Sequence, residues 1–303
     1  GVKIGQIEEY HPENKDVLQG VYTYLTGQHN SNSHHAYYVG SIMHTIAPQA
    51  SYYSAAITPD YNCYARIEEL ITAGCSVINH SAGFDRSGSW NSINWYDNLE
   101  KWIDHIEGPH GISFVQAAGN TGEAEGYVAS PGLAYNAITV GAINDNNTVD
   151  NSDDTVRSFS SSVNGGSDGC AKPDLMAPDT AIANLGGTSF SAPVVSGVIA
   201  QLMEFKPYLK GNSRLVKAVL TASCGYKASE SIYSGLTAVE GAGIINANTA
   251  YLILASNQYY SGSFSASELN YTISLTGSPS RVGLAFARIS SIGSNHTSGT
   301  VTA

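Results

Sequence analysis

The sequence predicts an α/β fold in which helices cover both faces of a mostly parallel sheet. Short Val- and Ile-rich segments, such as 2–8 and 137–142, alternate along the chain with helical patterns, such as Tyr64–Ala73 and Leu215–Ser223. The chain has 303 residues, which fits one large domain with or without a small second one. Sheets of this kind bind ligands at the carboxyl ends of their strands, so functional residues are expected there.

The composition excludes several classes of partner. Charged residues make up 13% of the chain, compared with about 25% in an average protein. The net charge is −11 and no basic cluster is present, which argues against binding to nucleic acid or to an anionic membrane surface. No stretch reaches the ~18–20 apolar residues of a membrane span.

The first strand, 2–8, ends at Glu8 and is followed by Glu9, and alternation along a strand points these two side chains to opposite faces. The most informative segment lies much later, where Ser189 stands immediately before an apolar helix with Pro193 in its first turn. A helix N-terminus offers unpaired N–H groups and a favourable dipole to negative charge, so Ser189 has the setting of a nucleophile.

The whole run 186–204, GGTSFSAPVVSGVIAQLME, resembles the nucleophile motif of subtilisin-like serine peptidases, including its Ser-x-Ala-Pro continuation. The resemblance implies a subtilisin-like fold with Ser189 as nucleophile, and it requires a histidine and an acid as partners. The segment 32–40, NSHHAYYVG, resembles the family's HGTHVAG motif, with His34 in the catalytic position and His35 as the less favoured base. The first strand ends where the family carries its acid, so we expect Glu8 to orient His34.

The oxyanion hole follows from a third motif. The segment 114–120, FVQAAGN, resembles the family's VVAAAGN strand, so Asn120 would donate its side-chain amide to the oxyanion together with the Ser189 N–H. Glu8, His34, Asn120 and Ser189 also follow one another in the chain order of the subtilisin-like enzymes.

Substrate-binding segments are carried over in the same way. The segment 77–83, VINHSAG, resembles a strand whose backbone pairs with the peptide substrate, and the end of the 114–120 strand would form the opposite wall of the primary pocket. The resemblance implies these wall residues: Ser81, Ala82, Gly83, Ala117, Ala118 and Gly119. His80 replaces the usual apolar residue and either lies near the substrate or packs in the core.

The resemblance covers residues 1–255, which we assign to the peptidase domain. Residues 256–303 alternate in a Ser/Thr-rich pattern that predicts a β-rich segment, a small sandwich with too few strands to be complete. The family further implies a secreted or cell-surface protein made with an inhibitory pro-domain, which we expect upstream in the precursor.

The four cysteines show no zinc-binding spacing. Cys63 and Cys75 bracket a helix and would be too far apart to pair, so Cys170–Cys224 is the more plausible bridge and buried thiols are the default. The acidic loop 145–154 does not match a defined calcium loop. No cofactor is required by this chemistry, and calcium, which the family often binds, stays unassigned.

These motifs predict a serine endopeptidase that cleaves polypeptides through an acyl-enzyme on Ser189. The sequence also leaves two alternatives open. A sedolisin-type serine-carboxyl peptidase also uses a glutamate and a Gly-Thr-Ser motif, but it would be most active in acid. A catalytically silent, peptide-binding pseudoprotease would fit the incomplete histidine motif.

Overall fold

The computed structural model describes residues 1–25, 32–58, 62–83, 96, 98–122, 128–163, 171–179, 185–225, 228, 237 and 239–259. Within these residues the strands are β1 (Lys3–Glu8), β2 (His11–Pro12), β3 (Tyr22–Tyr24), β4 (Asn32–Ser33), β5 (Ser51–Ala56), β6 (Val77–His80), β7 (Ser113–Ala117), β8 (Ile138–Asn144), β9 (Thr155–Val156) and β10 (Leu175–Pro178). The α-helices are α1 (His34–Ile46), α2 (Cys63–Thr72), α3 (Asn98–His110), α4 (Thr188–Phe205), α5 (Ser213–Ser223) and α6 (Ala247–Ala255), and short 3₁₀ turns occur at Asp16–Leu18, Asn151–Asp153 and Pro207–Leu209.

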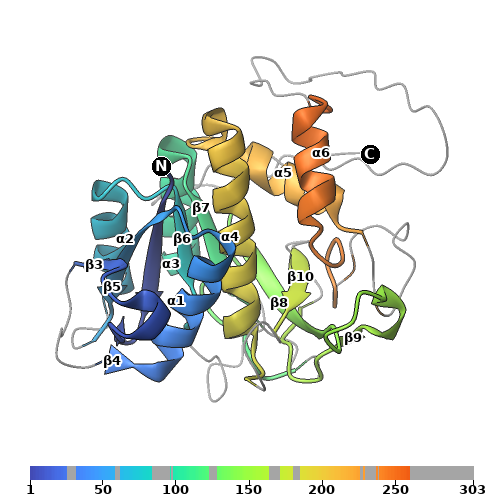
Figure 1. Ribbon diagram of the computed structural model, residues 1–303, viewed down its shortest axis with the longest axis horizontal. Coiled ribbons are helices and arrows are strands. Elements are labelled where there is room, and N and C mark those ends of the chain that lie inside the picture. The colour runs from blue at the N-terminus through green and yellow to red at the C-terminus, as the bar shows by residue number, and fades with distance from the viewer. Residues whose placement is uncertain are drawn as a thin grey trace.

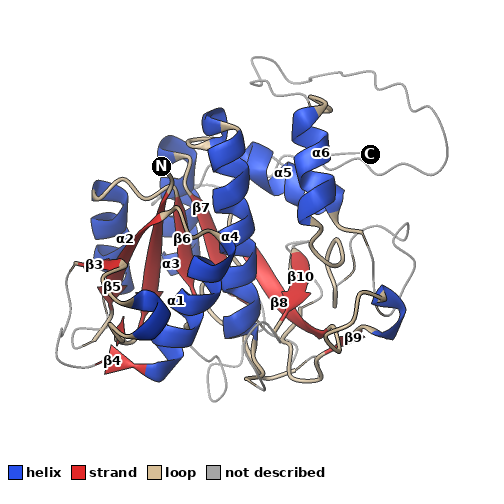
Figure 2. Cartoon of the chain, in the orientation of Figure 1, coloured by secondary structure: helices blue, strands red, loops and turns tan. Residues whose placement is uncertain are grey.

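The predicted sheet is confirmed. Eight of the described strands form one sheet in the order β10-β8-β7-β6-β1-β5-β3, with β9 paired to β8. Every pairing in this sheet is parallel except β8–β9, and a separate small sheet pairs β2 with β4. Figure 2 shows the red strands side by side with blue helices packed around them.

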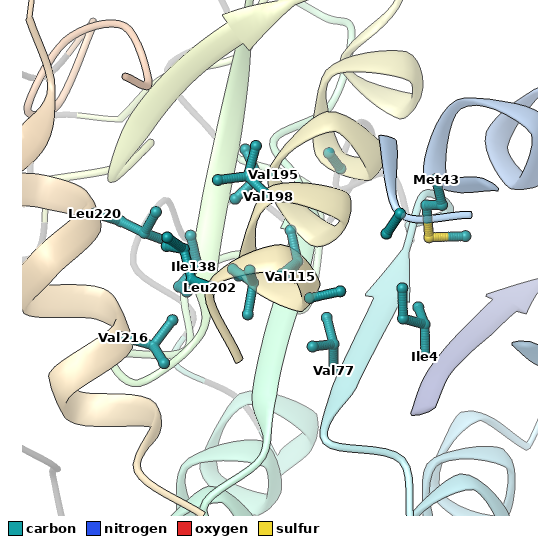
Figure 3. Packing of buried hydrophobic residues seen from close by; sticks show 14 of the residues in the cluster. Ile4, Met43, Val77, Val115, Ile138, Val195, Val198, Leu202, Val216 and Leu220 are labelled. Carbon is teal, nitrogen blue, oxygen red and sulfur yellow. The ribbon is translucent and has the colours of Figure 1, made fainter. Parts of the chain in front are cut away.

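Helices cover both faces, as the alternating pattern predicts. On one face α1 and α4 pack against the sheet, and α4 crosses the middle of it (Figure 1). Side chains of α4 such as Val195 and Leu202 meet strand residues such as Val115 in this core, and Leu220 of α5 joins them (Figure 3). The other face is covered by α2 and α3.

Two elements escaped the sequence-based prediction. Strand β5, SYYSAA, which lies between β1 and the edge strand β3, carries no Val or Ile. Helix α3 places three carboxylates, Glu100, Asp104 and Glu107, on its buried side. The predicted β-rich segment 256–303 lies almost entirely outside the described residues. The boundary drawn at 255 coincides with the end of α6, but its role as a domain boundary stays a prediction.

Cys63 and Cys75 are buried free thiols, and burial raises the pKa of each to about 12. Cys170 lies outside the described residues, so the Cys170–Cys224 pairing stays a prediction. None of the helices in the described part of the chain is long and apolar enough to span a membrane.

Candidate active site

Ser189 lies in the first turn of α4, one residue after the helix begins. The turn before it is made by Gly187, whose φ of +154° lies in a region that favours glycine. The Ser189 hydroxyl donates to the Ser81 carbonyl at 2.9 Å, just beyond the end of β6. In the first turn of a helix N–H groups have no intrahelical partner, so the Ser189 N–H points outward as a donor.

The histidine beside the acid is His35. Its Nδ1 lies 3.0 Å from Oε2 of Glu8, whose side chain is 3% exposed at the end of β1. Because a buried carboxylate accepts hydrogen bonds, Nδ1 carries the proton and Nε2 is left with its lone pair. The His35 ring lies 5.4 Å, centre to centre, from the ring of Phe190, the residue after Ser189. This contact places the imidazole next to the start of α4.

The environment of His35 favours its charged form. Burial lowers the pKa of His35, but the hydrogen bond and the charge of Glu8 outweigh it, so the pKa lies above the ordinary value of 6.5. Glu8 itself is buried while Glu9 is exposed, so the strand alternation selects Glu8 for the site.

The choice of His34 as the partner of Glu8 was wrong. The His34 side chain is 72% exposed, and its Nδ1 lies 3.3 Å from Oε2 of Glu13 instead. Ser33 caps α1 by accepting the Ala36 N–H, so the helix starts at His34, and neighbouring residues on a helix diverge by about 100°. Only one of the two can face Glu8, and it is His35.

A signal for His35 was present in the sequence. Aligning the HGTHVAG motif on His35 brings Val39 onto its valine, whereas aligning it on His34 matches only the final glycine at Gly40. Val39 is fully buried in α1, so it constrains the register of the helix more strongly than Gly40 does.

Asn120 lies directly beside the turn that precedes Ser189. Its Oδ1 accepts the Thr188 N–H at 2.9 Å and lies 3.1 Å from the Thr188 hydroxyl. Because the amide oxygen is taken up by Thr188, the amide group that remains to face a ligand is the Nδ2 donor. The Gly119 N–H donates to Thr188 Oγ1 at 3.0 Å, which ties the end of the 117–119 segment to α4.

The two expected substrate walls, 81–83 and 117–119, are held next to each other by Gln116. Its Nε2 donates to the carbonyls of Ala82 and Ala117, both at 2.9 Å. Its Oε1 lies 2.6 Å from Nδ1 of His80. The sequence leaves open whether His80 lies near the substrate or packs in the core. The structure shows that it packs in the core, because it is 1% exposed, and burial lowers its pKa and so favours the neutral ring.

Carboxylates of the acidic loop 145–154 take part in hydrogen bonds within that loop. Asp145, Asp150 and Asp153 each accept hydrogen bonds from within the loop, and in the described part of the chain no group of three or more His, Cys, Asp or Glu side chains could hold a metal. Calcium binding by this chain stays untested.

Comparison with known proteins identifies the family of this chain. The Peptidase_S8 model, described as "Subtilase family", matches residues 23–244. The chain belongs to the subtilase family. Among curated relatives, this subtilase is 36% identical over 125 residues to "Serine protease AprX" of Bacillus subtilis (strain 168), covering 33% of this chain and 27% of that protein. It is 30% identical over 218 residues to "Pyrolysin" of Pyrococcus furiosus, covering 60% of this chain and 15% of that protein. The chain therefore spans only about a quarter or less of the length of these relatives.

Solved structures of similar fold include two maturation proteases. The subtilase superimposes on the prenylagaramide maturation protease PagA with a TM-score of 0.63 and 23% identity, over 82% of this chain and 92% of that one. For the patellamide maturation protease PatA the TM-score is 0.65 at 21% identity, over 84% and 97% of the chains. Likeness at this identity establishes the subtilisin-like fold alone.

Proposed function

We propose that this subtilase is a serine endopeptidase in which Ser189 is the nucleophile, His35 the general base and Glu8 the residue that orients His35. The observation that carries the proposal is the Glu8–His35 hydrogen bond, formed by a histidine whose ring lies against Phe190 beside Ser189. An acid, a histidine and a serine brought together from β1, α1 and α4 form the arrangement that activates a hydroxyl.

The reaction follows from the tautomer of His35. Nε2 takes the proton from Ser189 Oγ as that oxygen bonds to the substrate carbonyl carbon, and the carbonyl electron pair moves onto the oxyanion. Asn120 Nδ2 and the Ser189 N–H donate to the oxyanion. Collapse of the intermediate breaks the C–N bond, and His35 returns the proton to the leaving amine. Water then repeats the sequence on the acyl-enzyme, with His35 again as base.

The free enzyme holds Ser189 in a resting position. Its hydroxyl is bonded to the Ser81 carbonyl, so it must rotate away from that carbonyl before it donates to His35. A substrate strand that adds along 81–83 brings backbone N–H groups to the edge that carries the Ser81 carbonyl. We propose that this strand binds between the 81–83 and 117–119 segments, whose walls comprise Ser81, Ala82, Gly83, Ala117, Ala118 and Gly119.

A fluorophosphonate probe tests the catalytic assignment. The protein is incubated with the probe at neutral pH and the adduct is mapped by mass spectrometry. Ser189→Ala should abolish labelling, and His35→Ala should slow it on the order of 10⁶-fold. His34→Ala is the matched control and should label at the rate of the parent. Labelling lost in His34→Ala but kept in His35→Ala would overturn the assignment.

The same experiment separates the alternatives. A silent peptide-binding protein would leave Ser189 unlabelled at every pH. A serine-carboxyl peptidase would label fastest in acid, whereas the mechanism proposed here loses activity when His35 is protonated. Secretion or cell-surface display, and an inhibitory pro-domain in the precursor, complete the proposal on the strength of the family alone.

A further inference from the structure

A short segment, residues 157–161, contacts both halves of the proposed oxyanion hole. It follows β9 and is anchored to β8, because the Arg157 N–H donates to the Ala142 carbonyl at 3.0 Å and Ser160 Oγ accepts the Ala142 N–H at 3.0 Å. The segment is therefore fixed to the sheet and can hold the residues that it contacts in place.

One half of the hole, the loop that carries Asn120, is held by the end of this segment. The Ser161 N–H donates to the Gly119 carbonyl at 3.0 Å, and Ser161 Oγ accepts the Thr121 N–H at 3.1 Å. The Gly122 N–H donates to the Phe159 carbonyl at 2.8 Å. These bonds bracket Asn120 on both sides.

The other half, the turn at Gly187 that precedes Ser189, is held through an ion pair. Arg157 binds Asp179 through Nε, at 2.9 and 3.0 Å from the two carboxylate oxygens, and through Nη2, at 2.8 Å from Oδ1. Oδ2 of Asp179 also accepts the Gly187 N–H at 3.1 Å, two residues before Ser189. Asp179 has no exposed surface, so its charge is stabilised by these donors alone among the described residues.

The ion pair has the properties of a rigid positioning device. A planar guanidinium that binds both oxygens of a carboxylate fixes its orientation as well as its position. The carboxylate then fixes the Gly187 N–H, while Asn120 takes up the Thr188 N–H. With these two N–H groups bound, the Ser189 N–H remains for the oxyanion.

We propose that Arg157 and Asp179 are positioning residues for the oxyanion hole. Together with Ser161 they set the distance between the Ser189 N–H and Asn120 Nδ2, the two proposed donors. The inference rests on the proposed function, and it adds a requirement that the triad does not contain: catalysis depends on an ion pair in which neither residue contacts the substrate.

Two variants test the inference on a chromogenic peptide. Asp179→Asn keeps an oxygen for the Gly187 N–H but loses the ion pair, and Arg157→Lys keeps the charge but loses the two-oxygen fork. Because a misplacement of about 1 Å can cost on the order of 10²-fold in rate, we expect kcat to fall about 10- to 100-fold in Asp179→Asn and less in Arg157→Lys. KM should change little, since neither residue contacts the 81–83 segment.

Lys217→Met is the matched control, because Lys217 forms another ion pair with a carboxylate that is largely buried, that of Asp174. The Lys217 Nζ lies 2.8 Å from Asp174 Oδ1 and donates to the carbonyls of Tyr135 and Ala137, just before β8. Lys217→Met should lower the unfolding midpoint as Asp179→Asn does, but it should leave kcat unchanged.

The outcomes separate the inference from the proposed function. If the parent protein neither cleaves the peptide nor labels with fluorophosphonate, the proposed function fails and the inference fails with it. If the parent is active and Asp179→Asn loses stability but keeps kcat, the ion pair is structural only and the inference alone is overturned. If Asp179→Asn does not fold, unchanged kcat in Arg157→Lys and in Arg157→Gln overturns it equally.

Discussion

Glu107 should make the protein less stable as the pH rises from about 5 to 8, which is opposite to the usual effect of a carboxylate. The side chain is 1% exposed on α3; Oε1 accepts the Phe114 N–H at 3.0 Å, and Oε2 has no hydrogen-bond partner among the described residues. Burial and the nearby charge of Asp104 raise the pKa of Glu107 to about 8, against the opposing effects of the Phe114 N–H, Lys217 and Lys172.

The sign follows from comparing the folded and unfolded chains. In the unfolded chain Glu107 releases its proton near the ordinary value of 4.5, whereas in the folded protein it keeps the proton to about pH 8. Between these values the unfolded state binds fewer protons, so the free energy of unfolding falls as the pH rises. At about 1.4 kcal/mol for each pKa unit, the loss is on the order of 3–5 kcal/mol by pH 8.

Glu107→Gln removes the titration and keeps an oxygen for the Phe114 N–H. Urea unfolding between pH 5 and pH 9, in the Ser189→Ala background to prevent self-digestion, should show similar stability of both proteins at pH 5 and a growing advantage of the variant up to pH 8. Glu68→Gln, on the exposed side of α2, should change neither value. A constant difference between parent and Glu107→Gln across this pH range would refute the reasoning.

Three further predictions concern the site and the core. The raised pKa of His35 should place the acid limb of the kcat/KM profile above pH 6.5. Glu8→Gln should move that limb to lower pH, because the Glu8 carboxylate raises the pKa of His35. If the limb does not move, Glu8 does not control the protonation of His35. Asn120→Ala should lower kcat by 10² to 10³, about 2.7–4 kcal/mol, with KM nearly constant, and an unchanged kcat would remove Asn120 from the oxyanion hole. Cys63 and Cys75 should resist alkylation at pH 8 until denaturant is added, since buried thiols with pKa values of about 12 form almost no thiolate; peptide mapping that finds either one modified in the folded protein would contradict this.

The parts of the fold that the sequence predicted are those with a one-dimensional pattern. The helix after Ser189 has an apolar face broad enough to be read directly, and it forms α4 with most of its side chains buried. The 2–8 strand has Val2, Ile4 and Ile7 as its apolar residues, and it forms β1 between β5 and β6. In both cases burial of apolar side chains decides the element, so composition along the chain suffices.

The missed helix α3 shows where this logic ends. A periodicity argument assigns charged residues to the solvent side, but Glu100, Asp104 and Glu107 all face the interior. Asp104 is stabilised there by N–H groups of Tyr135 and Asn136, which lie about thirty residues away and cannot be anticipated from the helix itself. Whether these carboxylates are buried therefore depends on the groups elsewhere in the chain that bond to them, and not on the residue types of the helix.

The histidine error has a related cause. Both His34 and His35 satisfy the chemistry of a general base, and the sequence offers each of them a glutamate, since Glu13 lies beside one and Glu8 beside the other. The position at which α1 begins decides between them, because it determines which of the two histidine side chains points toward β1. That choice depends on the Ser33 cap and on the packing of Val39, which are matters of helix geometry. A catalytic residue can therefore be identified by type from sequence, while its exact position follows from the packing of the element that carries it.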